Sequence, residues 1–546
     1  MNLDHGEIPK KQGEFAMISE KIEENQNESI KEEGINESSH LASTGALCLA
    51  MFCHTYLLMS VFPYAGFMAI YLIPGLSSET AGSYAGLISS CYMAGRAVCS
   101  FTWGAAADTI GRKPVLYLSF LLSSLCSIWF GLSSSIEIAF LSRFMMGMMN
   151  GLVLVVKTAV SEIARGDEKL EARGMGMVMG MWGWGYLIGP VISGLVSEPV
   201  KQYPKSEIVQ YFEPFFSKYP FVLPNLISVL LCLTGSILVF LFVDETLPEE
   251  KRQSISSIFK KYVDNLKMRI QRKKRYEGTL SENETLPLQC RNGKSHSIET
   301  NSMHENEVEN HRMKKKKKPS STSSSKLSVW SKESTRHHLI GYWICSFSNI
   351  MLDEAFPLFC IAKKGGLNLT ETGIGKILSG AGAIFIIGQY FSFTLLVSRF
   401  GIYKTLLISS IFATPVTIFM PFSLYLNRLQ TETNSLSWLA YIFLISIYAC
   451  KNIGINVLVS SITIATNRTV SADQRASMNG ISMLGGSIVK ALGPACAGFL
   501  ISFLLGGNTV APVAGSIILY GIISCIGIFC IFFTSLVLHK HHEVEE

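Results

Sequence analysis

Long apolar segments, separated by short polar ones, recur along most of this chain of 546 residues. Each holds about 20 or more mostly hydrophobic residues, the length that an α-helix needs to cross a bilayer. Because a helix satisfies its own backbone hydrogen bonds in lipid, the pattern predicts membrane-spanning helices. We expect them near 44–72, 81–104, 115–133, 137–163, 172–197, 221–243, 338–361, 371–397, 402–425, 438–464, 475–504 and 513–538.

Polar segments divide these spans into two sets of six. The predicted fold class is therefore an all-α membrane protein, with twelve transmembrane helices in two pseudo-symmetric six-helix bundles. The segments without apolar periodicity read as disordered. The expected parts are an N-terminal tail (1–43), a first bundle (44–244), a basic linker (245–335), a second bundle (336–538) and a C-terminal tail (539–546).

Composition agrees with a membrane protein. Only 16% of the residues are charged, against about 25% in soluble domains. The thirteen cysteines lie mostly within apolar segments, and no pair has the spacing of zinc ligands. We therefore expect them to act as packing residues, with no metal site in the chain and no cofactor. A lone His54 in the first span is expected to be a hydrogen-bonded wall residue.

Basic loops predict the orientation, because cytoplasmic loops carry an excess of Lys and Arg. The bases Arg112, Lys113, Arg165, Lys169, Arg173, Arg468 and Arg475 follow even-numbered spans, and Lys363 and Lys364 are the exception. Both termini and the linker are therefore expected in the cytosol, at a vacuolar, other endomembrane or plasma membrane. The run Lys314–Lys318 is expected to be solvated linker, with binding to anionic lipid as the alternative.

The turn between the second and third predicted spans is dense in charge and glycine. It contains Gly104, Asp108, Gly111, Arg112 and Lys113. Asp108 could face a helix N-terminus, where the dipole favours an anion, and the two bases could pair with acids on the other bundle. Such a cluster would latch one conformation and open in the other. We predict a conformational latch, while simple topology is the alternative.

Two internal repeats support the division into halves. Gly185, Gly189, Pro190 and Gly194 lie in the fifth span, and a similar Gly493-Pro494…Gly498 lies in the eleventh. A faint copy of the charged turn follows the eighth span at Ser398-Arg-Phe-Gly401, with Ser398 standing where Asp108 does. Paired motifs in two halves are typical of transporters built from structural repeats.

Charged and polar residues within the spans are functional candidates, because burying them in lipid is costly. A stripe of Arg143, Gly147, Asn150, Lys157 and Ser161 is expected along one face of the fourth span. The translocation candidates are Arg96, Asn150, Lys157, Asp353, Glu354, Lys451, Asn452 and Lys490. We expect Glu354 to face Lys451 or Lys490 and to carry a proton, with static ion pairing as the alternative.

The charged turn, Trp103-Gly104…Asp108…Gly111-Arg112-Lys113-Pro114, resembles the signature loop of the major facilitator superfamily. The glycine–proline series of the fifth span resembles the motif of its drug:proton antiporter branch. Further segments resemble the zinc-induced-facilitator-like family: Arg143-Phe144…Gly147…Asn150-Gly151, Gln202-Tyr203-Pro204, Glu354, Gly365-Gly366-Leu367, Lys451-Asn452 and Asp473-Gln474-Arg475. The resemblance covers nearly all twelve spans.

The resemblance implies a monomeric secondary transporter that works by alternating access, most simply by proton-coupled antiport. Several cations and few deep acids favour a small organic solute, an organic anion or a metal chelate as substrate. A proton symporter, a uniporter and a transporter-like receptor remain alternatives. No Walker loop is present, so neither an enzyme nor an ATP-driven pump is expected, and no nucleic acid partner is expected.

Overall fold

The computed structural model describes residues 41–164, 168–252, 333–428, 436–470, 475–507 and 510–545. Residues 1–40 of the predicted N-terminal tail (1–43), most of the predicted linker and the run Lys314–Lys318 lie outside the described residues. The first half contains a helix at Leu41–Met59, α2 (Ala65–Leu72), α3 (Ala81–Ile110), α4 (Arg112–Gly131), α5 (Ile136–Met149), α6 (Leu152–Ile163), α7 (Glu168–Val196), α8 (Pro199–Gln202), α9 (Glu207–Tyr211), α10 (Glu213–Lys218), α11 (Val222–Phe242) and η1 (Glu249–Lys251). The second half contains α15 (Glu333–Ile361), α16 (Glu371–Phe412), η2 (Pro415–Phe419), α17 (Phe422–Arg428), α18 (Trp438–Arg468), α19 (Arg475–Gly506) and α20 (Pro512–Glu545).

Ten helices among the described residues are long and apolar enough to cross a membrane. This set omits α3, which runs for 30 residues. It also counts Glu371–Phe419 as one segment, although Gly401 breaks the helical geometry of α16 with φ 74° and ψ 171°. The helical character is as predicted, and the number of twelve spans stays a prediction.

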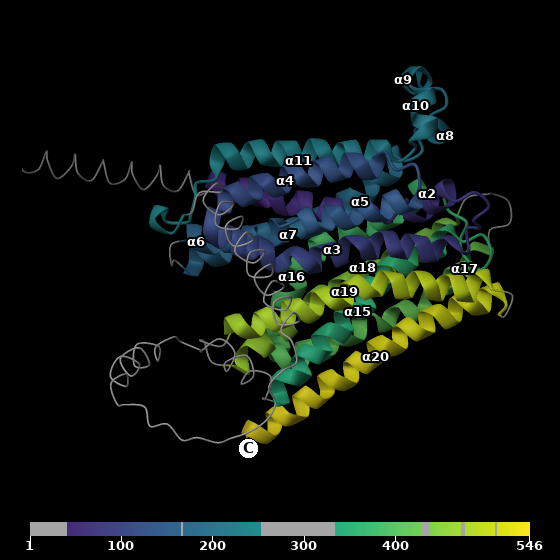
Figure 1. Ribbon diagram of the computed structural model, residues 1–546. Helices are drawn as coiled ribbons and strands as arrows, with labels where there is room; N and C mark the ends of the chain where they lie inside the picture. The colour runs from purple at the N-terminus through teal and green to yellow at the C-terminus, as the bar shows by residue number, and fades with distance from the viewer. Residues whose placement is uncertain are drawn as a thin grey trace, which may run out of the picture.

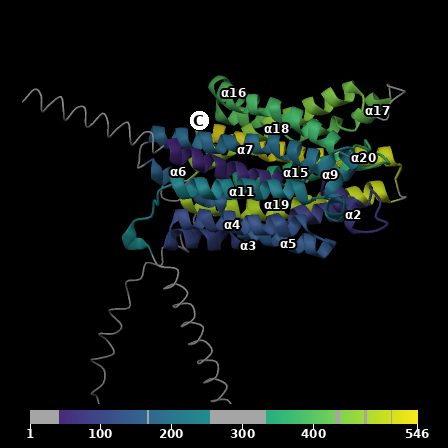
Figure 2. The same ribbon diagram turned by 90° about the horizontal axis from the view of Figure 1, so that it is seen from above.

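The long helices run side by side in two groups. In Figure 1 the first-half helices α4, α5 and α11 lie on one side and the second-half helices α15, α19 and α20 on the other. Figure 2 shows α3, α4 and α5 opposite α16, α17 and α18. We call the end where α3 meets α4 the linker end, because α11 leaves and α15 enters the bundle there, and the other end the far end.

The most extensive packing between the halves is that of α3 on α19 and of α7 on α16. Glycines permit this close approach. A Cβ atom at Gly498 would lie 2.1 Å from the carbonyl oxygen of Gly82. One at Gly194 would lie 2.7 Å from the carbonyl oxygen of Glu371. The repeated Gly-Pro…Gly motifs of α7 and α19 therefore pack on equivalent helices of the opposite half.

The fourth predicted span is broken in the middle. Asn150, with φ −96° and ψ 91°, ends α5, and α6 begins at Leu152. Trp103 packs against Gly151, where a Cβ atom would lie 2.7 Å from the indole ring. The expected continuous stripe along this span is therefore wrong, because a register read across Asn150 does not continue from one helix to the next.

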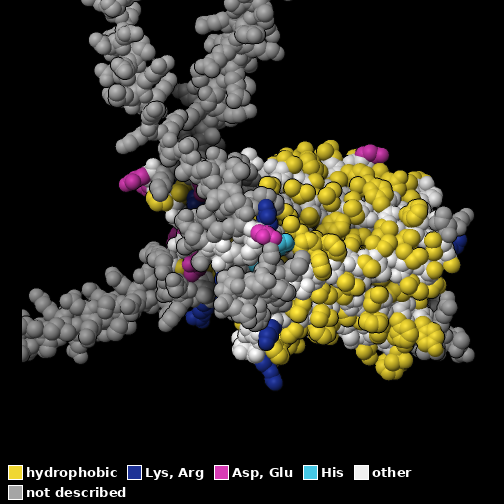
Figure 3. All heavy atoms as spheres, turned by 90° about the horizontal axis from the view of Figure 1, so that it is seen from below, with side chains coloured by type: hydrophobic (Ala, Val, Ile, Leu, Met, Phe, Trp, Pro, Cys, Tyr) yellow, Lys and Arg dark blue, Asp and Glu magenta, His cyan; other side chains and the backbone are white. Residues whose placement is uncertain are grey.

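The bundle is wrapped in apolar side chains. Figure 3 shows them covering the flank, while charged side chains gather at one end of that face. Outward-facing residues of α11 such as Leu230 (65% exposed) and Phe240 (63%) are typical of contact with lipid. The short helices α8 to α10 project sideways at the far end (Figure 1) and expose Ile208 and Tyr211. At the C-terminus, α20 continues to Glu545. The residues after 538, which were expected to form a separate tail, therefore extend this helix.

Candidate functional site

The charged turn forms a compact ion cluster within the first half. Arg112 is 6% exposed. Its guanidinium donates hydrogen bonds to Glu162 at 2.8 and 3.0 Å, to Asp108 at 3.0 Å and to the Ala107 carbonyl at 2.7 Å. Bidentate Arg–carboxylate pairs of this kind combine strength with fixed geometry. Thr246 donates a further hydrogen bond to Glu162 at 2.5 Å.

Glu245 caps the N-terminus of α4. Its carboxylate accepts hydrogen bonds from the backbone N–H groups of Arg112 at 2.8 Å and Lys113 at 3.1 Å. An anion there satisfies free donors and complements the helix dipole. The sequence assigned a helix-end role to Asp108, but Glu245 fills it at α4, and Asp108 pairs with Arg112 instead. The partners of Arg112 in this conformation all belong to the first half.

The glycine–proline motif of α7 packs on two neighbours. A Cβ atom at Gly185 would lie 2.5 Å from Thr55, and one at Gly189 would lie 3.4 Å from Met59. The Pro190 carbonyl oxygen would lie 3.1 Å from a Cβ atom on Gly375 of the second half. The motif therefore places α7 between the first helix and α16, where it joins the two halves.

A buried acid–lysine cluster lies at mid-height between the halves. Lys451 is 0% exposed, and its ammonium donates to Asp353 Oδ1 at 2.6 Å and to Asn452 at 3.0 Å. The same Asp353 oxygen accepts hydrogen bonds from the hydroxyls of Tyr448 at 2.9 Å and Tyr186 at 2.8 Å. Because Tyr186 comes from α7, this carboxylate connects the first half to the second.

Glu354 points elsewhere. It is 2% exposed and lies beside Ser89 of α3, in the opposite half, within electrostatic range of Arg143. The Ser89 hydroxyl is the polar group that neighbours this carboxyl, although neither Glu354 Oε2 nor Ser89 Oγ forms a hydrogen bond of regular geometry among the described residues. The expected pairing of Glu354 with Lys451 is wrong: adjacent residues on a helix face about 100° apart, and Asp353 occupies the face that meets Lys451.

Three cations from the two halves lie near one another: Arg96 on α3, Lys157 on α6 and Lys490 on α19. We call these three residues the cation cluster. Lys157 lies within electrostatic range of the other two. Each is half-buried, and none forms an ion pair with an acid within the described chain. Lys490, expected near Glu354, belongs here instead.

His54 and Asn150 order this cluster. The His54 ring is within 3.3 Å of Arg96 Nη1 and 2.9 Å of Asn150 Oδ1, so the imidazole links the guanidinium to the amide. Trp182 packs 5.8 Å from the His54 ring. His54 is thus the hydrogen-bonded wall residue that its sequence position indicated, and it borders the group of cations rather than a metal.

Arg143 lies apart from the cation cluster. Its guanidinium is stacked over Tyr92 at 4.8 Å and Phe130 at 5.1 Å, and it donates to the Leu57 carbonyl at 3.2 Å. Cation–π contacts of this type stabilise a buried charge without an anion. The break at Asn150 separates Arg143 from Lys157, which the sequence had placed on one stripe.

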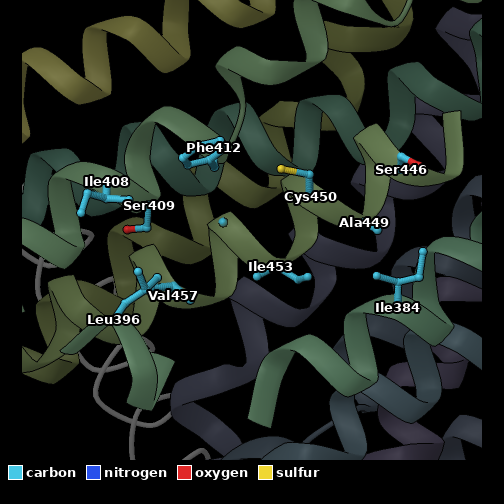
Figure 4. Close-up of a pocket in the computed structure, with 11 residues that line it drawn as sticks. Ile384, Leu396, Ile408, Ser409, Phe412, Ser446, Ala449, Cys450, Ile453 and Val457 are labelled. Carbon is cyan, nitrogen blue, oxygen red and sulfur yellow. The ribbon is translucent and has the colours of Figure 1, made fainter. Parts of the chain in front are cut away.

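Other features do not form a site for a metal or a polar solute. In the described part of the chain, no group of three or more His, Cys, Asp or Glu side chains could hold a metal ion. A groove of about 360 Å³ between α16 and α18 is lined mainly by apolar residues, with Phe412, Cys450 and Ile453 among them (Figure 4). Its lining offers no charge to bind a polar solute.

Four residues of these clusters were not on the candidate list: Tyr186, Tyr448, Glu162 and Glu245. The two tyrosines donate hydrogen bonds to Asp353, Glu162 accepts one from Arg112, and Glu245 caps α4 beside Arg112. Tyrosines within apolar segments look like ordinary packing residues in a sequence. Glu162 and Glu245 stand at helix ends near the basic turn, and that position is the signal that could have indicated them.

A lipid-covered helical bundle in two halves, with buried charges between them, defines a polytopic solute transporter. The Major Facilitator Superfamily model matches residues 47–494. The chain therefore belongs to the major facilitator superfamily, as its motifs predicted, and its family consists of transporters rather than enzymes. Protein ZINC INDUCED FACILITATOR-LIKE 1 of Arabidopsis thaliana is 28% identical over 460 residues, which cover 83% of each chain. The multidrug transporter mfsB of Aspergillus fumigatus is 24% identical over 497 residues, or 84% of this chain and 77% of mfsB.

Solved structures share the fold at lower identity. The D-xylose-proton symporter superposes with a TM-score of 0.60 at 10% identity, over 90% of this chain and 97% of the symporter. The human organic anion transporter MFSD10 superposes with a TM-score of 0.53 at 15% identity, over 91% of this chain and 99% of the other. These similarities confirm the predicted all-α major facilitator fold.

Proposed function

We propose that this protein is a proton-coupled antiporter that moves a small organic anion, or an anionic metal chelate, by alternating access. The observation that carries the proposal is the cation cluster of Arg96, Lys157 and Lys490, which has no acid partner among the described residues. Half-buried positive charges that lack a counter-ion repel one another, and an anionic ligand relieves that repulsion. Because Lys490 belongs to the second half, a bound anion would contact both halves.

Two buried acids support proton coupling. Glu354 lies buried at the interface, its Oε2 has no regular hydrogen bond among the described residues, and burying an ionised carboxylate is costly. Glu354 is therefore the described acid best placed to bind a proton. Asp353 is held by Lys451 and two tyrosines, so we assign it to joining the halves.

Alternation is supported by where the halves touch. The hydrogen bonds found between the halves in the described chain lie at mid-height and at the far end. In two of them, the Ser83 N–H donates to Ser502 Oγ at 2.9 Å and the Lys364 N–H donates to the Glu79 carboxylate at 3.0 Å. With the linker end in the cytosol, as the basic loops favour, this conformation is closed at the far end and faces the cytosol. Asp108, whose side chain is 72% exposed, remains available to the second half when the linker end closes.

Relatives are named for related tasks. Two curated relatives carry the name zinc induced facilitator, and another is a multidrug transporter. These names support a small solute that is handled as an organic molecule or a chelate. The absence of a ligand set for bare zinc among the described residues directs the proposal to a chelate.

Transport into proteoliposomes tests the proposal. The full chain would be reconstituted, a pH gradient imposed, and uptake measured for radiolabelled citrate, benzoate, free zinc and zinc–citrate. We expect uptake of at least one anion to depend on the gradient and Lys490→Gln to lower it at least tenfold. Lys376→Gln, which removes an exposed lysine of α16 outside the cluster, is the matched control.

The coupling assignment has a separate readout. Glu354→Gln should retain exchange of anion against anion but lose its response to the pH gradient. If pH-driven uptake by Glu354→Gln equals that of the unmodified protein, Glu354 is not the proton carrier. If no gradient drives any of the four probes while the probes still bind, the protein is a receptor instead.

A further inference from the structure

Two glutamates from different halves lie together at the far end, away from both clusters described above. Glu198 follows α7 and is 7% exposed, and Glu371 begins α16 and is 4% exposed. Their carboxyl groups lie close enough to interact directly, and a Cβ atom on Gly194, four residues before Glu198, would lie 2.7 Å from the Glu371 carbonyl oxygen. Neither residue belongs to a motif that the sequence analysis identified, and neither has a place in the transport mechanism proposed above.

The surroundings hold the two carboxyl groups in place. Lys201 Nζ is 2.5 Å from Glu198 Oε1. Beside the pair, Thr372 donates a hydrogen bond to Gln202 Oε1 at 2.8 Å, which also joins α16 to α8. Glu371 Oε1 is buried and has no hydrogen-bond partner among the described residues. A proton on one of the two carboxyl groups would provide the hydrogen bond that this buried oxygen lacks.

Two carboxylates at this separation cannot both be ionised without strong repulsion, and one shared proton removes it. Lys201 is paired with Glu198, so we assign the shared proton to Glu371, whose O–H then donates to Glu198. The charged and titratable groups facing the pair are Lys201 and, near Gly373, the hydroxyl of Tyr441 on α18. Neither supplies a second positive charge beside Glu371.

We propose that Glu198 and Glu371 form a proton-binding site that holds the far end closed, and that loss of this proton separates the halves there. Protonated, the pair is a hydrogen bond between the halves. Deprotonated, it places two negative charges at the narrow contact between Gly194 and Glu371. Acid on the far side would thus return the carrier to the conformation that faces the linker end.

This inference rests on the proposed alternating access but not on the proposed substrate. Its test therefore needs no substrate. Ser83→Cys places a thiol at the far-end contact with Ser502. The full chain in lipid nanodiscs would be labelled with N-ethylmaleimide between pH 5 and pH 8, and labelling of the introduced thiol at position 83 would be read by peptide mass spectrometry. At each pH, this labelling would be divided by that of the same protein carrying Glu371→Gln. The ratio cancels the effect of pH on the ionisation of the thiol itself.

We expect the ratio to be near one at pH 5 and to rise at least fivefold by pH 8. Glu198→Gln removes the other carboxylate of the pair, so its labelling should show as little pH dependence as that of Glu371→Gln. Either variant can therefore serve as the reference if the other fails to fold. Lys201→Gln should move the midpoint of the rise upward by roughly half a pH unit, the size typical of an exposed ion pair.

Glu79→Gln is the matched control. It removes a far-end carboxylate that contacts the second half but lies outside the pair, and it should keep the full rise. A ratio that stays within twofold of one across the range would overturn the inference, even if anion exchange is confirmed. An unchanged rise in anion-inactive Lys490→Gln would separate this site from the substrate site.

Discussion

Gly111 and Gly401 have the same unusual backbone conformation, with φ 108° and ψ 164° at Gly111 and φ 74° and ψ 171° at Gly401. Only glycine adopts this region readily. Both residues join one long helix to the next at corresponding places of the two halves. The faint copy of the charged turn is therefore a true structural repeat of the backbone, although the ion cluster around it has been kept in the first half only.

Replacing the two glycines should reveal this asymmetry. Ala at either position is strained by about 1–3 kcal/mol. Gly111→Ala also brings a Cβ atom to 2.2 Å from Glu245 Oε2, whereas Gly401→Ala meets nothing within 4 Å. We expect Gly111→Ala to lower the midpoint of thermal unfolding clearly more than Gly401→Ala. Scanning fluorimetry in detergent would measure both, and equal shifts would contradict the role of Glu245.

The ion cluster at Arg112 predicts a second contrast. Glu162→Gln removes the charge of the carboxylate that receives two hydrogen bonds from the buried guanidinium. Breaking one partner of a buried pair costs about 3–5 kcal/mol, and partial exposure of Glu162 reduces this to about 2 kcal/mol. Arg399→Ala, at the exposed copy of the turn, should change stability by less than about 0.5 kcal/mol. Thermal unfolding of the two variants in detergent would measure the difference, and equal losses would contradict a special role for the Arg112 cluster.

The buried pair of Asp353 and Lys451 predicts a rescue. Asp353→Asn and Lys451→Met each leave one buried charge without its partner, at a cost of about 3–5 kcal/mol. The double variant removes both charges, so its thermal midpoint should recover to nearly that of the unmodified protein. Size-exclusion profiles after heating would compare the three. A double variant as unstable as the sum of the single ones would show that this ion pair is not the dominant interaction.

Glu79 predicts a pH effect of opposite direction to that of the carboxyl pair. Partial burial favours a raised pKa, but hydrogen bonds from the Glu79 and Lys364 N–H groups and from serine hydroxyls outweigh it and hold the pKa of Glu79 below its ordinary value of 4.5. A lowered folded-state pKa contributes stability above the unfolded value, which is lost as the pH falls through the folded value. The far-end contact to Lys364 should therefore weaken as the pH falls below 4.5 and through the lower folded-state pKa of Glu79.

Glu79→Gln isolates that effect. In the Ser83→Cys background, this variant should be labelled at position 83 equally at pH 3.5 and pH 4.5. The protein with Glu79 intact should be labelled more at pH 3.5, after correction with a free thiol measured at both values. Greater labelling of both proteins at pH 3.5 would place the acid-sensitive group elsewhere.

Sequence patterns predicted the large-scale organisation well. Apolar length identified the bundle, the repeated glycine motifs indicated its two halves, and Arg112 proved to be the centre of an ion cluster. Pairing was harder to predict, because a sequence gives the face of a residue only relative to its own helix. Asp353 and Glu354 are neighbours in the chain, yet one meets Lys451 and the other meets Ser89 of the opposite half.

Local breaks account for the other differences. Periodicity through Asn150 assumed a continuous helix, and the interruption there moved Arg143 and Lys157 into different surroundings. Glu198 and Glu371 are 173 positions apart in the sequence, and both stand at the ends of spans. Acidic residues are common there, so neither one indicates a site by its position alone. Only the approach of α7 to α16 brings them together, and no spacing rule within one span could indicate it.

The low hydropathy of α3 has a consequence for biogenesis. This helix carries Arg96 and Ser89 and contributes to the contact with α19, yet it falls outside the set apolar enough to cross a membrane unaided. A nascent α3 would therefore partition weakly into lipid and would depend on its neighbours to remain there. Substitutions in α5, which packs along it, are expected to show their first effect as failed insertion and degradation of α3 during synthesis.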